Sequence, residues 1–141
     1  MSNISPALAK QLLEEAKAAR ESSYAPYSQC RVGAALLTAD GKIYRGCNIE
    51  NAAFGPTVCA ERVAIFKAVS EGVHDFAAIA VVGGKGEQTD GLFPPCGVCR
   101  QVLREFCIPE KMRIILEQKD GSPIQLTLSD LLPHSFGPDF L

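Results

Sequence analysis

Three cysteines and a glutamate form the part of this sequence best suited to chemistry. Cys59 opens the run Cys-Ala-Glu, and Cys96 and Cys99 lie in a later Pro-Cys-Gly-Val-Cys run. Both runs fall where we predict a helix to start, and the partial positive charge of a helix N-terminus stabilises thiolates, the form that binds zinc. Three protein ligands plus a water are typical of catalytic zinc, whereas structural sites usually close with four ligands. The pattern predicts one catalytic Zn²⁺ per subunit.

Glu61 follows Cys59 by two residues and should lie in the same helical turn. Zinc lowers the pKa of a bound water, so that hydroxide is available near neutral pH. A carboxylate beside that water can take its proton and pass it to a ring nitrogen and a leaving amine. Cys-x-Glu followed by Pro-Cys-x-x-Cys is similar to the signature of zinc deaminases that act on nucleobases. Glu61 is therefore the predicted catalytic residue.

Arginines directly follow both cysteine runs, at positions 62 and 100. Zn²⁺ with three thiolates carries a net negative formal charge, which weakens its pull on a water. We hypothesise that Arg62 donates hydrogen bonds to the ligand sulfurs and offsets this charge.

Other roles for the cysteines are open at this level. A lone Cys-x-x-Cys is often structural or redox-active, although the redox reading expects it after an early strand near the N-terminus. A four-cysteine structural zinc site would need Cys30, Cys47 or Cys107, none of which belongs to a second Cys-x-x-Cys. We interpret Cys107 and Cys47 as small apolar residues.

Length and charge exclude several classes of protein. A chain of 141 residues is expected to form one domain, residues 1–141. The net charge of −2 and the absence of a Lys/Arg run disfavour a nucleic-acid polymer as partner. No apolar stretch approaches the roughly 20 residues of a membrane span. Without a signal-peptide pattern we expect a cytoplasmic protein, in which six cysteines favour metal binding over disulfides.

Hydrophobic periodicity and turn signals predict the elements that position the cysteines. In chain order we expect a helix from Ser5-Pro6 to about 22–24, strands at 31–37 and 42–48, a helix at 58–70, a strand at 76–82, a helix at about 97–107, strands at 112–117 and 124–128, and a short helix at 128–132. This order predicts an α/β fold, a mixed sheet sandwiched by helices. The crossover through helix 97–107 should join parallel strands, with a right-handed connection.

Several stretches carry a wider resemblance. They are Tyr24-Ala25-Pro26-Tyr27-Ser28, Val32-Gly33-Ala34-Ala35-Leu36, Gly46-Cys47-Asn48-Ile49-Glu50-Asn51-Ala52, Cys59-Ala60-Glu61-Arg62, Pro95-Cys96-Gly97-Val98-Cys99-Arg100-Gln101, Leu131-Leu132-Pro133 and Ser135-Phe136-Gly137. In this order they resemble the small homotetrameric zinc-dependent cytidine deaminases. The resemblance implies hydrolytic deamination of cytidine and 2′-deoxycytidine to uridine and 2′-deoxyuridine, with ammonia release, in pyrimidine salvage. It also implies a three-layer α/β/α sandwich with a five-stranded mixed sheet, and a homotetramer whose active sites borrow residues from neighbouring subunits.

The resemblance assigns roles to further residues. It implies that Asn48 and Glu50 bind the ribose and that the backbone of Ala60 holds the pyrimidine edge. Taken without the resemblance, the sequence favours a role for Asn48, Glu50 and Asn51 in capping their loop. Phe136 matches an aromatic residue placed over the base bound by a neighbouring subunit, the alternative being a tail residue packed on its own domain. Phe54 replaces a tyrosine often found there and is expected to approach an adjacent site.

One position departs from the family pattern. Cys30 stands where the family usually has a phenylalanine that stacks near the nucleoside. An aromatic side chain buries on the order of 150–250 Å², so we predict a roomier pocket and weaker nucleoside binding, or an altered base preference.

Three other functions compete with a nucleoside deaminase. The same chemistry would serve a deaminase of a nucleoside antibiotic such as blasticidin S, which would act poorly on cytidine. A polynucleotide-editing deaminase is opposed by the acidic balance and the missing basic groove. A non-enzymatic zinc module that binds proteins would need a fourth ligand and a dispensable Glu61.

Overall fold

The first helix shows how local sequence signals become structure. In the computed structural model, which describes residues 3–89 and 91–141, Ser5 is the N-cap of α1 and its side chain accepts a hydrogen bond from the Leu8 N–H. Pro6 takes the first helical position, where its missing N–H costs nothing. The elements are α1 (Pro6–Arg20), β1 (Cys30–Thr38), β2 (Ile43–Cys47), α2 (Ala60–Ser70), β3 (Phe76–Lys85), α3 (Gly97–Phe106), β4 (Arg113–Glu117), β5 (Pro123–Thr127), α4 (Leu128–Leu131) and a 3-10 turn (Pro138–Phe140).

The strands form one mixed sheet in the order β2-β1-β3-β4-β5. β3 and β4 run parallel, joined through α3, and the other neighbouring pairs are antiparallel. The predicted five-stranded mixed sheet and its parallel pair are therefore confirmed.

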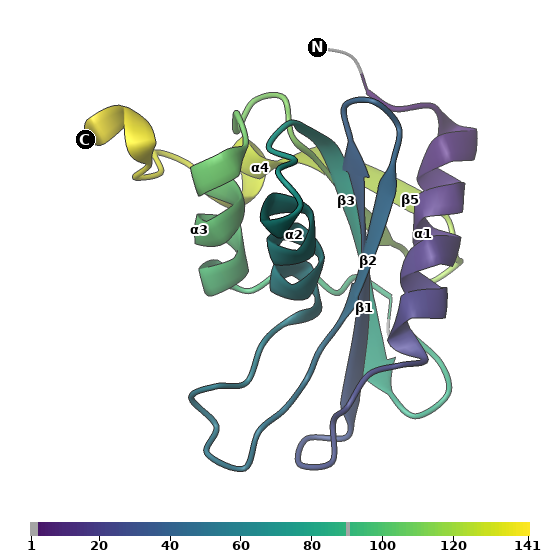
Figure 1. The fold of residues 1–141 in the computed structure, drawn as a ribbon. Coiled ribbons are helices and arrows are strands. Elements are labelled where there is room, and N and C mark those ends of the chain that lie inside the picture. Colours follow the sequence, from purple (N-terminus) through teal and green to yellow (C-terminus); the bar gives the residue numbers. More distant parts are fainter. Residues whose placement is uncertain (1–2, 90) are drawn as a thin grey trace.

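Helices cover both faces of the sheet, as Figure 1 shows. On one face α1 packs Leu12 and Leu13 against strand residues such as Ala80 and Val82. On the other face, Ile65 of α2 and Leu103 of α3 pack against the apolar side chains that the strands direct to that side. Two separate apolar clusters on opposite faces give the three-layer α/β/α sandwich that the resemblance implied. In the described part of the chain, none of the helices is long and apolar enough to cross a membrane.

Several element boundaries differ from the prediction by a few residues, and backbone pairing explains the differences at α2 and β3. The predicted helix start at Val58 is wrong: α2 begins at Ala60, because the backbone of Val58 exchanges two hydrogen bonds with Ile49. β3 continues to Lys85 through two glycines expected to end it, because Gly83 and Gly84 pair with β1. Pairing with a neighbouring strand thus keeps both glycines in the sheet.

Candidate active site

The predicted ligand cysteines lie at the starts of two neighbouring helices. Cys59 is the N-cap of α2 and Cys96 the N-cap of α3, both with extended backbone. Neither side chain forms a capping hydrogen bond, so both sulfurs are available to other partners. Cys99 lies in the first turn of α3 and is fully buried. The first helical N–H groups have no partner within a helix, and they stabilise negative charge at these positions.

The three sulfurs meet at one point. Cys59 Sγ lies 3.8 Å from Cys96 Sγ, which lies 3.7 Å from Cys99 Sγ. A tetrahedral zinc with Zn–S bonds of about 2.3 Å separates its sulfurs by about 3.8 Å. Among residues 3–89 and 91–141, this trio is the group of cysteine, histidine or acidic side chains that could hold a metal, and no fourth ligand joins it. The donor set therefore fits one zinc ion with an open position.

The three sulfurs are close enough to shift the pKa values of Cys59 and Cys99. A hydrogen bond from Cys99, aided by Arg62, lowers the pKa of Cys59 to about 5. The same hydrogen bond raises the pKa of Cys99, and burial raises it further. Zinc binds cysteines as thiolates, so binding of all three sulfurs releases protons.

Glu61 is buried beside this cluster, with 4% of its surface exposed. Burial, reinforced by the negative charge of Cys59, raises the pKa of Glu61 to about 7. A carboxyl group with such a pKa can both accept and donate a proton near neutral pH. Its place in the first turn of α2 is the one predicted from the Cys-x-Glu spacing.

A glycine sets the position of the helix start that carries these groups. A Cβ on Gly46 of β2 would collide with the Ala60 carbonyl and lie 2.6 Å from the Ala64 nitrogen. Without a side chain there, α2 rests directly on the sheet. Ala60 is fully buried as the first helical residue, and its N–H has no partner within the helix.

The two arginines that follow the cysteine runs have different partners. Arg62 Nη2 donates to Cys59 Sγ at 3.4 Å, the kind of contact that the hypothesis requires. Its Nε is buried without a hydrogen-bond partner among the described residues. Arg100 instead donates from Nε to the Pro95 carbonyl at 2.7 Å and from Nη1 to the Leu131 carbonyl at 2.6 Å. Arg100 therefore holds the backbone just before Cys96.

A backbone bridge places the predicted ribose residues beside the cysteines. Ile49 and Val58 exchange N–H···O bonds of 3.0 Å in an antiparallel bridge. By that register Asn48 stands opposite Cys59, and Glu50 stands opposite Thr57. Tyr24 bridges the other side of Ile49.

The Asn48 side chain is bound by residues of the 23–32 segment, which includes the start of β1. Its side-chain oxygen accepts hydrogen bonds from Ser23 Oγ and, at 2.8 Å, from the Val32 N–H. Its Nδ2 donates to the Cys30 carbonyl at 2.8 Å. An amide nitrogen carries two donors, so one N–H of Asn48 remains for a ligand.

Glu50 is held in a cavity of about 400 Å³ that also includes Tyr27, Phe54 and Thr57. Its Oε1 accepts hydrogen bonds from the Tyr27 and Ser28 N–H groups at 2.9 and 3.1 Å, and its Oε2 accepts from Ser28 Oγ. These bonds, that from Ser28 Oγ first, lower the pKa of Glu50 and keep it ionised. Sequence reasoning missed this supporting role of Tyr27 and Ser28; the matched Tyr24–Ser28 stretch was the signal that could have found it.

The remaining predicted residues occupy different surroundings. Cys30 is half-buried at the start of β1 and packs on the core of the α2 and α3 face. Phe54 is 71% exposed, edge-to-face with Tyr27 at 6.1 Å. Phe136 is 56% exposed and stacks on Phe140 at 5.5 Å, away from the residues that line the Glu50 cavity. The chain alone thus does not bring Phe136 to that cavity.

The sequence of this chain is similar to a known protein family and to named proteins. Residues 6–115 match the family model of the cytidine and deoxycytidylate deaminase zinc-binding region. The chain is 50% identical over 132 residues to a cytidine deaminase of Sporosarcina psychrophila, covering 94% of this chain and 93% of that protein. It is 51% identical to one from Halalkalibacterium halodurans, covering 89% and 91%.

Solved structures show the same fold. A crystal structure of cytidine deaminase from Burkholderia pseudomallei matches with a TM-score of 0.81 and 49% identity, covering 89% of this chain and 97% of that one. The Mycobacterium tuberculosis cytidine deaminase matches with a TM-score of 0.75 and 38% identity, covering 90% and 95%.

Proposed function

The chain belongs to the cytidine and deoxycytidylate deaminase zinc-binding family, and we propose that it hydrolyses cytidine and 2′-deoxycytidine to uridine and 2′-deoxyuridine, releasing ammonia in pyrimidine salvage. The observation that carries the proposal is the three-sulfur cluster, with sulfurs 3.7–3.8 Å apart, next to the buried Glu61. Relatives about half identical over nearly the whole chain bear the name cytidine deaminase.

The residues divide the work as follows. A zinc ion held by Cys59, Cys96 and Cys99 would supply an activated water for attack on the pyrimidine ring. Glu61 takes one proton from the water and gives it to the ring nitrogen; it then takes the proton of the newly formed hydroxyl group and gives it to the amine, which leaves as ammonia. The unpaired N–H groups at the start of α2, where Ala60 lies, bind the polar edge of the base.

The sugar is bound at the other end of the site. Glu50, oriented by the donors of Tyr27 and Ser28, accepts a hydrogen bond from a ribose hydroxyl. Asn48 offers its remaining N–H to the same sugar. These assignments rest on the family match and on the backbone bridge that aligns residues 48–50 with Cys59.

The test is the ultraviolet absorbance of cytidine after addition of the purified, zinc-loaded protein, followed beside blasticidin S and a cytidine-containing oligonucleotide. Loss of cytidine absorbance with release of ammonia supports the proposal. Loss with blasticidin S alone, or with the oligonucleotide alone, would replace it by one of the competing deaminases. A zinc-loaded protein inactive on all three would point to the non-enzymatic module.

We further propose that the chain works as a homotetramer in the cytoplasm. Its support is the resemblance to the small homotetrameric cytidine deaminases, together with large apolar side chains exposed on α2, α3, the 51–57 loop and the tail. They are Phe54, Phe66, Val98, Phe136 and Phe140. A neighbouring subunit would cover them and receive Phe136 over its bound base. Sedimentation of the purified protein tests the assembly.

Replacing Arg62 with glutamine should weaken zinc binding about tenfold and lower kcat, because the Cys59 sulfur loses its charged donor. Competition with a zinc chelator and steady-state kinetics measure the two effects. Arg45→Gln, an exposed change on β2, is the control. Unchanged zinc affinity and kcat in Arg62→Gln would remove Arg62 from the site.

Replacing Cys30 with phenylalanine should lower KM for cytidine, because the added ring restores contact area beside the nucleoside. Steady-state kinetics of the variant are compared with those of Cys30→Ala, which adds no area and should not lower KM. An equal or higher KM in Cys30→Phe would show that this position does not determine the pocket size.

A further inference from the structure

Arg20 is buried although its side chain is charged: 3% of its surface is exposed. It is the last residue of α1, where a basic side chain usually points to solvent and complements the helix dipole. Here its guanidinium points inward instead. Gly33 allows the end of α1 to lie close to β1, since a Cβ there would lie 2.6 Å from the backbone nitrogen of Arg20.

Within residues 3–89 and 91–141, the partners of the guanidinium are backbone carbonyls. Nε donates to Arg31 O at 2.8 Å, at the start of β1. The two terminal nitrogens donate to carbonyls of one short segment: Gly84 and Gly86 at 2.8 Å, Glu87 at 3.2 Å and Gln88 at 3.4 Å. Gly86 has a φ of +75°, a conformation that costs glycine little. One cation thus gathers four carbonyl groups of residues 84–88.

That segment spans the end of β3 and the beginning of the connection from β3 to the zinc cysteines. Between Lys85 and Gly97 the described residues form no helix or strand, so side-chain contacts must determine their path. Two further contacts hold the same connection. Thr89 Oγ donates to Glu117 at 2.6 Å, and Glu117 is paired with Lys17 of α1. The Phe93 ring packs on Gly83, where a Cβ would lie 2.6 Å from it.

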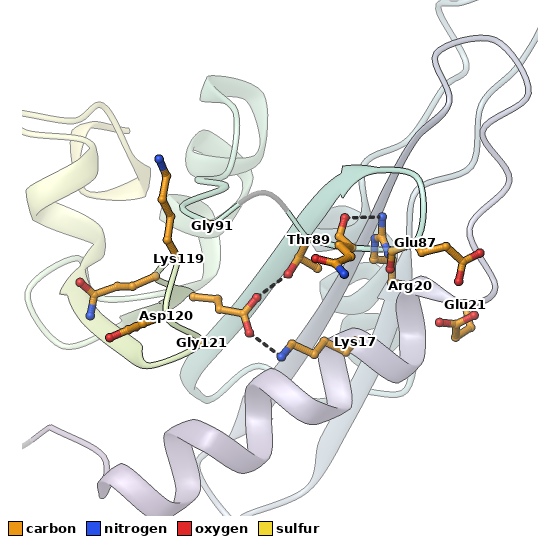
Figure 2. A pocket seen from close by; sticks show the side chains of 12 residues that line it. Lys17, Arg20, Glu21, Glu87, Thr89, Gly91, Lys119, Asp120 and Gly121 are labelled. Atoms are coloured by element: carbon orange, nitrogen blue, oxygen red, sulfur yellow. Dashed lines mark hydrogen bonds and ion pairs between the residues drawn. The ribbon is translucent and has the colours of Figure 1, made fainter.

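Figure 2 shows this region as the wall of a cavity of about 460 Å³ beside α1. Arg20 points toward the segment around Glu87, and Lys17 toward the carboxylate that also receives Thr89. None of the residues predicted to bind zinc or nucleoside lines this cavity. The contacts of Arg20 and Thr89 on this wall both end on or start from the segment that follows β3, so they hold that segment in place.

We propose that Arg20 is a positioning residue for the metal centre: by holding residues 84–88 it fixes the connection that delivers Cys96 and Cys99 to Cys59. The far end of the same connection is held by Arg100, which binds the Pro95 carbonyl. These contacts hold both ends of the connection, and the Cys96 sulfur that follows it lies 3.8 Å from Cys59 Sγ and 3.7 Å from Cys99 Sγ. Releasing one end lets the α3 ligands separate from Cys59, which speeds zinc loss. The inference rests on the zinc site of the proposed function but not on the choice of nucleoside.

Lysine cannot replace the arginine fully. A guanidinium carries five N–H donors in a planar fork, whereas an ammonium has three donors at one point. Arg20→Lys should therefore hold only part of the segment, and Arg20→Met should hold none of it. This order of effects separates loss of the carbonyl contacts from loss of charge or volume.

The experiment follows transfer of zinc from the full-length zinc-loaded protein to excess chromogenic chelator, at a temperature where every variant is folded. Arg20→Met should release zinc about tenfold faster than wild type, and Arg20→Lys by an intermediate factor. Leu13→Ala is the matched control: it leaves a hole on the buried face of the same helix without touching residues 84–88. It should lower Tm and leave the release rate unchanged.

Amide hydrogen exchange supplies the second readout. The amides of residues 86–89 and 91–93 should exchange faster in both Arg20 variants and at the wild-type rate in Leu13→Ala. Wild-type release rates in the Arg20 variants would overturn the proposal, as would equal acceleration in Leu13→Ala. If Arg20→Met does not fold, Arg20→Lys decides alone by the same criteria. A wild type that holds zinc but leaves cytidine unchanged would refute the nucleoside assignment and leave this test valid.

Discussion

Replacing Glu61 with glutamine is expected to lower kcat on cytidine by a factor on the order of 10²–10⁴ while zinc content stays unchanged. Glutamine keeps the size of the side chain but cannot carry a proton between the water and the ring. Glu61 is 4% exposed and does not belong to the ligand trio, so the metal site itself should survive the change. Ultraviolet kinetics and zinc analysis of the same preparations measure both quantities.

The control is Glu14→Gln, which removes a carboxylate from the exposed side of α1 and should leave kcat unchanged. A Glu61→Gln protein that keeps its zinc and at least half of the wild-type kcat would remove Glu61 from the proton path. Loss of zinc together with activity would instead assign Glu61 a role in holding the metal.

Replacing Cys99 with alanine is expected to abolish both zinc binding and deamination. Cys99 is the fully buried member of the trio, so neither water nor a mobile neighbour can readily take the place of its sulfur. Two thiolates alone form an incomplete set for tetrahedral zinc. Zinc content per chain and the rate of cytidine loss, measured on the same sample, test the expectation.

Cys107→Ala is the matched control, since Cys107 is a buried cysteine at the end of the same helix and lies outside the trio. Burial raises the pKa of Cys107 to about 12, as expected for a thiol that packs as a small apolar group. The control should keep its zinc and its activity. Retention of one zinc per chain by Cys99→Ala would reject the three-thiolate assignment.

The prediction of the metal centre depended on local information. Cys59 and Cys96 were expected at helix starts because the residues after them have helical periodicity, and both are N-caps in the structure. The boundaries of the elements were predicted less well. Val58 was predicted as the first residue of a helix, yet its backbone is hydrogen-bonded to Ile49, which only the fold brings alongside.

The roles of the polar residues near the predicted ribose site were predicted only in part. The sequence alone left Asn48 and Glu50 as loop caps or ribose ligands, and the structure shows capping contacts for both. Their ribose role remains a proposal, since caps can also bind a ligand through the groups left over. Ser28 entered only as part of a matched motif, although its hydroxyl orients Glu50.

By itself the sequence determined the donor chemistry: three thiols, a carboxylate two residues from the first of them, and helix starts at both cysteine runs. These properties depend on residue type and short-range spacing, which the chain states directly. Only the tertiary structure decided that the two helix starts lie side by side, that Gly46 seats α2 on the sheet, and that Arg20 turns inward to the 84–88 carbonyls. Such contacts join residues far apart in the chain, and no local pattern distinguishes a buried arginine at a helix end from a solvated one.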